Sequence, residues 1–110
     1  MKSIRNKIVI LGSDYNGFEL KKIIWDELTS MNYIPMDIGS YDTNKVDFTR
    51  YINTVNQIIS DGDAKHGILI SGVMIDIGSD YKNTNVLCLG SWQIPVQKNL
   101  KIVKKWLKRK

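Results

Sequence analysis

The sequence has few residues that could form covalent or metal crosslinks, and it has no long hydrophobic run. Its one cysteine, Cys88, excludes an intramolecular disulfide, and with the single His66 it makes no set of zinc ligands. No apolar stretch approaches the roughly 20 residues of a membrane-spanning helix, and Ile8–Leu11 is too short for the core of a signal peptide. We therefore expect a cytoplasmic protein without a metal, a cofactor or a membrane association.

Acidic residues are absent from the last part of the chain. Residues 98–110 carry seven cationic side chains and no acid, so subtraction from the net charge of +5 leaves −2 on residues 1–97. The basic character therefore belongs to one terminal segment and not to the whole protein. The length of 110 residues and the 43% hydrophobic content fit one soluble globular unit, and we predict a single domain over residues 1–110.

Apolar residues alternate between strand-like runs and stretches with helical spacing. Pro35 lies in the second run, and because proline cannot donate a ladder hydrogen bond, that strand should lie at a sheet edge. The order strand–helix–strand–helix–strand–strand–helix is typical of a three-layer, Rossmann-like α/β fold with a parallel sheet and helices on both faces. The predicted strands are residues 8–11, 33–39, 66–70 and 86–89, and the predicted helices begin near residues 17, 47 and 95.

Residues with capping preferences mark the starts of the three predicted helices. Asn16 and Glu19 have the spacing of a capping box, Asp47 can cap the second helix, and Pro95 suits the first turn of the third. The buried face of the third helix should comprise Val96, Leu100, Val103 and Leu107, with Trp106 beside it.

Small polar residues follow each predicted strand. Ligands bind at the carboxyl ends of the strands in a parallel α/β sheet. At Gly39 and Gly90 the need to turn the chain explains the glycine, but Gly12–Gly17 leads directly into a helix whose N-terminus attracts anions. The turn after the first strand, with the carboxylate of Asp14, is therefore the first candidate ligand site.

Four segments together resemble the ribose-5-phosphate isomerase B family, which includes the subunits of galactose-6-phosphate isomerase. They are "GSDYNGFELK", "DIGSY…VDFTRY", "DGDAKHGILISG" and "NTNVLCLGS", in the same order over roughly residues 7–107. The resemblance implies a homodimer or larger assembly that interconverts aldose and ketose sugar phosphates without a metal. In that chemistry a base moves a proton between neighbouring carbons, and backbone N–H groups stabilise the oxyanion. A histidine helps to open the sugar ring, and basic side chains hold the phosphate.

The resemblance also assigns roles to residues at the ends of the first and third strands. The family has Asp-His where this chain has Asp14 and Tyr15, so Asp14 can still accept hydrogen bonds from sugar hydroxyls but Tyr15 supplies no imidazole. Ser71 stands where the family usually has a catalytic cysteine. A serine hydroxyl is not a base without a partner that takes its proton, so the position is degenerate.

The segment after Ser71 departs furthest from the family. Of a glycine-rich loop that binds the oxyanion, only Gly72 is retained, and Asp76 is a weak substitute for a catalytic base. About twenty family residues, which form a strand and a helix, are missing before the "NTNVLCLGS" segment. We therefore expect four strands, and exposed apolar surface on the third and fourth unless they pair directly. Alignment puts Tyr81, Lys82 and Trp92 in the places of a ring-opening histidine, an asparagine and an arginine.

Three functions are compatible with these residues, and we prefer the second. An active isomerase of pentose phosphate or related sugar metabolism would need the changed groups to be replaced. We prefer a homologue with reduced or lost catalysis, a pseudoenzyme that retains at most sugar-phosphate or subunit binding, as a homodimer or with a related subunit. The alternative is a protein-interaction module or non-catalytic subunit whose basic C-terminal helix contacts an acidic partner. We do not expect nucleic acid binding through Lys98–Lys110, because the lysine spacing is typical of a solvated helix face.

Overall fold

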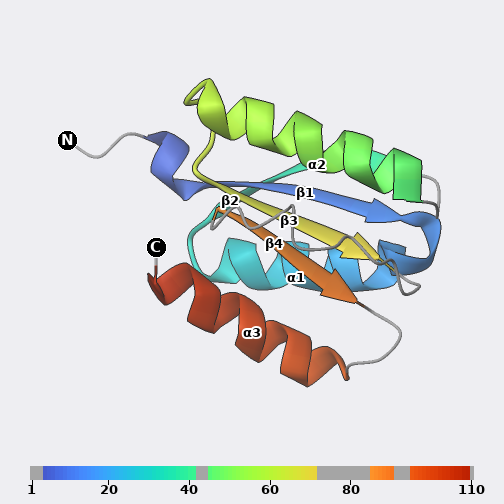
Figure 1. Cartoon of the computed structure of the whole chain (residues 1–110). Coiled ribbons are helices and arrows are strands. Elements are labelled where there is room, and N and C mark those ends of the chain that lie inside the picture. Colours follow the sequence, from blue (N-terminus) through green and yellow to red (C-terminus); the bar gives the residue numbers. More distant parts are fainter. Residues whose placement is uncertain (1–3, 42–44, 72–84, 91–94, 110) are drawn as a thin grey trace.

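A computed structural model describes residues 4–41, 45–71, 85–90 and 95–109 of the chain. Within these ranges a parallel sheet of four strands lies between helices on both of its faces (Figure 1), which confirms the predicted fold class. The strands are β1 (Ile8–Asp14), β2 (Ile34–Tyr41), β3 (His66–Ser71) and β4 (Val86–Gly90). The helices are α1 (Phe18–Ser30), α2 (Lys45–Ser60) and α3 (Val96–Arg109), with 3₁₀ turns η1 (Ile4–Lys7) and η2 (Tyr15–Gly17).

The strands follow the order β2-β1-β3-β4, so β2 is an edge strand, as Pro35 predicts. β3 pairs directly with β4, from Gly67 opposite Val86 to Ser71 opposite Gly90. Because the two strands pair directly, they do not expose the apolar surface that the missing strand and helix would otherwise have left on them. All six residues of β3 are accordingly buried.

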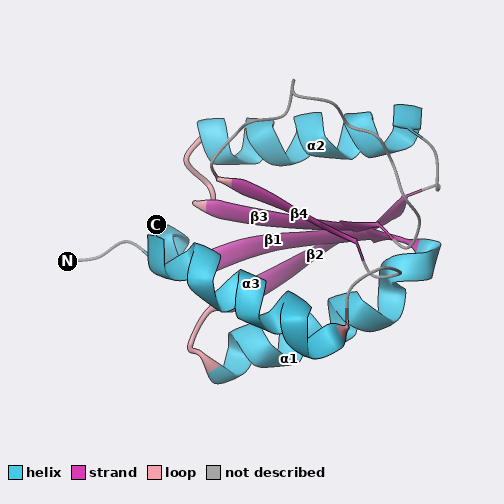
Figure 2. Cartoon of the chain, turned by 60° about the horizontal axis from the view of Figure 1, so that its bottom comes forward, coloured by secondary structure: helices cyan, strands magenta, loops and turns pink. Residues whose placement is uncertain are grey.

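The core is divided into two layers by the sheet. Helices α1 and α3 cover one face and α2 covers the other (Figure 2). The larger cluster joins β1 and β3 to α1 and α3 through Leu11, Ile24 and Val103, each without exposed surface. The smaller cluster joins the opposite face to α2 through Phe48, Ile52 and Val55. The amphipathic stripes of the three helices therefore decide which face each one covers.

The starts of two helices differ from the sequence prediction. α1 begins at Phe18 after Gly17, which makes no side-chain capping hydrogen bond, so the predicted capping box at Asn16 is wrong. The cap lies one element earlier, because Asp14 caps the 3₁₀ turn that precedes the helix. α2 begins at Lys45, so Asp47 lies within its first turn instead of preceding it. There the Asp47 carboxylate is still stabilised by the positive end of the helix dipole.

The buried face of α3 is shorter than predicted. Leu100, Val103 and Leu107 are buried as expected, but Val96 at the start of the helix is 40% exposed. Trp106 is half-buried, and its ring meets that of His66 edge to face at 5.3 Å between centroids. Trp106 therefore helps to fix α3 against the sheet. No helix of the described residues is long and apolar enough to cross a membrane.

Candidate functional site

The carboxylate of Asp14 organises the turn between β1 and α1. Asp14 is the last residue of β1, and its Oδ1 accepts a hydrogen bond from the backbone N–H of Gly17 at 2.7 Å. A Cβ at position 17 would lie 2.8 Å from Cγ2 of Ile70 and 3.2 Å from Oδ1 of Asp14. Glycine is therefore required there by close approach, and the turn seats the start of α1 directly against the end of β3.

The second carboxylate oxygen of Asp14 contacts the end of β3. The hydroxyl of Ser71 donates a hydrogen bond to Oδ2 of Asp14 at 3.2 Å, and the two residues are 6% and 0% exposed. The neighbouring parallel strands bring these side chains together although they are 57 positions apart in the sequence. The sequence alone did not assign a partner to Ser71. In the structure, the carboxylate of Asp14 is positioned to accept the proton of the Ser71 hydroxyl.

Of the other predicted site residues, Tyr15 is the one that lies within the described part of the chain. The side chain of Tyr15 is 69% exposed, so it projects into solvent from the turn that Asp14 caps. Gly72, Asp76, Tyr81, Lys82 and Trp92 lie outside the described residues, and their roles remain predictions.

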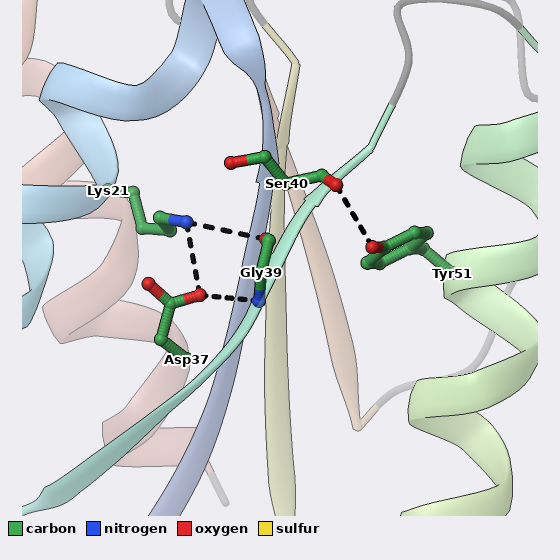
Figure 3. A network of polar contacts seen from close by, with 5 residues as sticks. All are labelled: Lys21, Asp37, Gly39, Ser40 and Tyr51. Atoms are coloured by element: carbon green, nitrogen blue, oxygen red, sulfur yellow. Dashed lines mark hydrogen bonds and ion pairs between the residues drawn. The ribbon is translucent and has the colours of Figure 1, made fainter.

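A partly buried ion pair between α1 and β2 was not predicted from the sequence. Lys21 of α1 is 4% exposed, and its Nζ donates to Oδ1 of Asp37 at 3.0 Å and to the carbonyl of Gly39 at 3.3 Å (Figure 3). The same Oδ1 accepts the backbone N–H of Gly39 at 2.7 Å. The sequence does contain one indication that Lys21 is buried, because it lies between Leu20 and Ile24 on the side of α1 that faces the sheet.

Two chemically reactive side chains lie away from this edge. His66 begins β3, at the opposite end of the strand from Ser71, and it is buried beside the rings of Tyr33 and Trp106. His66 is therefore packed at the far end of β3 from Asp14 and Ser71. Cys88 in β4 is half-buried, and burial raises the pKa of its thiol from 9.0 to about 11. Among the described residues, no group of three acidic, histidine or cysteine side chains could hold a metal ion.

The parallel sheet, with Asp14 and Ser71 at the carboxyl ends of two neighbouring strands, defines a Rossmann-like α/β fold, a class in which ligands bind at that edge. The sequence model of the family described as Ribose/Galactose Isomerase matches residues 9–81, and the chain belongs to this family. The match confirms the resemblance that the four sequence segments indicated.

Individual relatives agree with this assignment. The chain is 27% identical to ribose-5-phosphate isomerase B of Escherichia coli over 124 aligned positions, which cover 92% of this chain and 83% of that protein. It is 32% identical over 74 residues to a Rickettsia bellii protein that carries the name sugar phosphate isomerase, covering 66% of this chain but 51% of that one. The chain thus matches about half the length of this relative. The structure of Clostridium thermocellum ribose-5-phosphate isomerase B superimposes with a TM-score of 0.74 at 26% identity, over 92% of this chain and 84% of that one.

Proposed function

We propose that this protein binds a phosphorylated sugar at the carboxyl edge of its sheet and has reduced or lost aldose–ketose isomerase activity. The observation that carries the proposal is the buried pair of Asp14 and Ser71, which occupies the strand ends where the family resemblance puts substrate binding and the catalytic cysteine. The edge is preserved as a polar site, but the group that would remove a proton from carbon is changed.

The chemistry of Ser71 supports weak or absent catalysis. A cysteine thiol ionises near pH 8.5 and supplies some thiolate at neutral pH, whereas a serine hydroxyl stays protonated unless another group takes the proton. Asp14 is the acceptor that Ser71 has, yet its other oxygen is already engaged by the Gly17 amide. Loss of a positioned acid or base typically costs a factor of roughly 10²–10⁴ in rate. We therefore expect the turnover rate to be at least about a hundredfold lower than that of an intact isomerase.

Binding has better support than turnover. The carboxylate of Asp14 can accept hydrogen bonds from sugar hydroxyls. Helix α1 begins at Phe18, directly after the 3₁₀ turn that Asp14 caps. Backbone N–H groups and the dipole at a helix N-terminus favour a phosphate group. The sugar would then lie along the ends of β1 and β3 with its phosphate toward α1.

The assembly is a second part of the proposal. The family resemblance implies oligomers, and we propose a homodimer or a hetero-oligomer with a related subunit that supplies the missing catalytic groups. A specific observation also favours the alternative of a protein-interaction module. α3 contains no acidic residue and presents exposed lysines at 98, 101, 105 and 108, while Lys104 pairs with Glu27 of α1 at 3.5 Å, so its outer face is complementary to an acidic partner.

A turnover assay tests the proposed function. Purified protein is incubated separately with ribose 5-phosphate and galactose 6-phosphate, and ketose formation is followed beside Escherichia coli ribose-5-phosphate isomerase B. We expect at least a hundredfold lower rate for this chain, and an increased rate in Ser71→Cys. A rate comparable to that of the control enzyme, abolished by Asp14→Ala, would show that catalysis is intact and overturn the proposal.

A further inference from the structure

The end of β2 contains a β-bulge beside the candidate site. Leu11 of β1 lies opposite Asp37, but two positions later Ser13 lies opposite Ser40, so β2 has one residue more than β1 in this interval. Gly39 lies in the bulge with φ of +103°. A Cβ there would meet nothing closer than the Tyr51 hydroxyl at 3.8 Å, so glycine is required by the backbone conformation and not by lack of space.

A bulge changes the face of the sheet to which the following side chain points. Ile38 precedes the bulge and packs in the cluster beneath α2, and in an unbroken strand Ser40 would point to the same face. Instead, Figure 3 shows the Ser40 hydroxyl directed away from Tyr51 of α2 and toward the side on which Lys21 lies. Ser40 lies opposite Ser13, the residue before Asp14, so the bulge puts its hydroxyl at the carboxyl edge of the sheet on the side of α1.

Side chains from both covering helices hold this bulge in place. On the α1 side, the buried ammonium of Lys21 joins the carboxylate of Asp37 to the carbonyl of Gly39, and it lies 5.6 Å from the centroid of the Phe18 ring. On the α2 side, the hydroxyl of Tyr51 donates to the carbonyl of Ser40 at 3.0 Å (Figure 3). A lysine is rarely buried unless it is paired. Its ammonium is buried and contacts both Asp37 and the bulge carbonyl of Gly39, whereas the Asp37 side chain is 39% exposed.

We propose that Lys21 is a positioning residue of the sugar-phosphate site: by fixing the bulge through Asp37 and Gly39, it presents the hydroxyl of Ser40 on the α1 side of the carboxyl edge, as a further contact to the bound sugar phosphate. This inference rests on the proposed function for the identity of the ligand. The Lys21 ammonium does not touch the ligand, since it is engaged with Asp37 and Gly39. Ser40 is the residue that would contact it.

The test compares two neighbouring lysines of the same helix. Lys21→Met removes the buried ammonium, whereas Lys22→Met removes an exposed one and leaves the same net charge. Each variant is titrated with ribose 5-phosphate and galactose 6-phosphate, and exchange of the Gly39 amide hydrogen is measured by NMR without ligand. We expect Lys21→Met to weaken binding about tenfold and to accelerate Gly39 exchange at least tenfold, with Lys22→Met within twofold of wild type in both. Ser40→Ala should weaken binding by a similar factor while Gly39 exchange stays unchanged.

Two readouts separate this inference from the proposed function. If wild-type protein binds neither sugar phosphate, the proposed function fails and with it the role of Ser40, while Gly39 exchange still reports on Lys21. Unchanged Gly39 exchange in Lys21→Met, or unchanged sugar binding in Ser40→Ala when wild type binds, overturns the inference. Should Lys21→Met fail to fold, Tyr51→Phe removes the hydrogen bond to Ser40 from the other face. We expect that variant to weaken binding at least threefold, and unchanged affinity would again overturn the inference.

Discussion

The hydroxyl of Ser71 and the carboxylate of Asp14 lie 3.2 Å apart at the ends of neighbouring parallel strands, and both side chains are buried. The contact joins β3 to the turn that starts α1. It has two consequences, because it stabilises the edge of the sheet and also engages the two groups that the family resemblance assigns to substrate chemistry.

The Asp14–Ser71 contact should be visible as an energetic coupling. A hydrogen bond to a charged group contributes about 1.5–3 kcal/mol, so we expect a coupling of about 1–2 kcal/mol in a double-mutant cycle of Asp14→Ala and Ser71→Ala. The free energies of unfolding are measured by urea denaturation. As a control, Asp14→Ala combined with the exposed Thr54→Ala should give additive losses within about 0.5 kcal/mol. Additivity in the Asp14–Ser71 cycle as well would mean that the hydrogen bond contributes nothing to stability.

Substitution of Gly17 should disturb the site through its packing. In Gly17→Ala the new methyl group meets Cγ2 of Ile70 at 2.8 Å, so the turn or β3 must move. Overpacking of this kind typically costs about 1–3 kcal/mol, and we expect such a loss in thermal or urea unfolding. Lys22→Ala on the exposed face of α1 is the matched control and should stay within about 0.5 kcal/mol of wild type. A neutral Gly17→Ala would show that the turn has more room than the geometry indicates.

Val96 and Val103, two valines of α3, should differ in their contribution to stability. Val103 has no exposed surface, whereas Val96 is 40% exposed. Val103→Ala removes buried methyl groups and leaves a cavity, so a loss of about 2 kcal/mol is expected. Val96→Ala should change the free energy of unfolding by less than about 0.5 kcal/mol. Equal losses in the two variants would contradict the burial pattern of this helix.

Ionisation of Cys88 should make stability depend on pH in the alkaline range. Burial raises the pKa of the thiol from 9.0 to about 11, so the unfolded chain loses this proton at lower pH than the folded one. The contribution of the protonated thiol to the free energy of unfolding is therefore complete below about pH 9 and is lost as pH rises to about 11. Between pH 8 and pH 10, wild type should lose about 1 kcal/mol more than Cys88→Ala. Urea denaturation of both proteins at the two pH values measures this, and parallel losses would exclude the buried thiol as the cause.

The sheet could be predicted from the sequence because its determinants are local. Pro35 excludes a central position for its strand, and the apolar runs around Val9 and Ile68 have the continuous character of strands buried on both faces. The helix boundaries were predicted less well. The signal at Asn16 resembles a capping box, but the inserted 3₁₀ turn moves the capping function to Asp14.

The candidate site could be predicted only in part, since its residues acquire their partners through tertiary structure. Asp14 and Ser71 were recognised individually from the resemblance, but their contact depends on the pairing of β1 with β3. Lys21 was missed because a lysine on an amphipathic helix is ordinarily exposed. It contacts the bulge at Gly39, and no local pattern in the sequence indicates that bulge.

Binding of a sugar phosphate is tested most directly by titration of the wild-type protein with ribose 5-phosphate and galactose 6-phosphate, monitored by calorimetry or tryptophan fluorescence. The unphosphorylated sugars are the ligand controls, and Asp14→Ala is the protein control. We predict saturable binding of at least one phosphorylated sugar, at least tenfold weaker binding of the corresponding free sugar, and loss of binding in folded Asp14→Ala. Absence of saturable binding to both sugar phosphates, or binding that Asp14→Ala leaves unchanged, would contradict a sugar-phosphate site at this edge of the sheet.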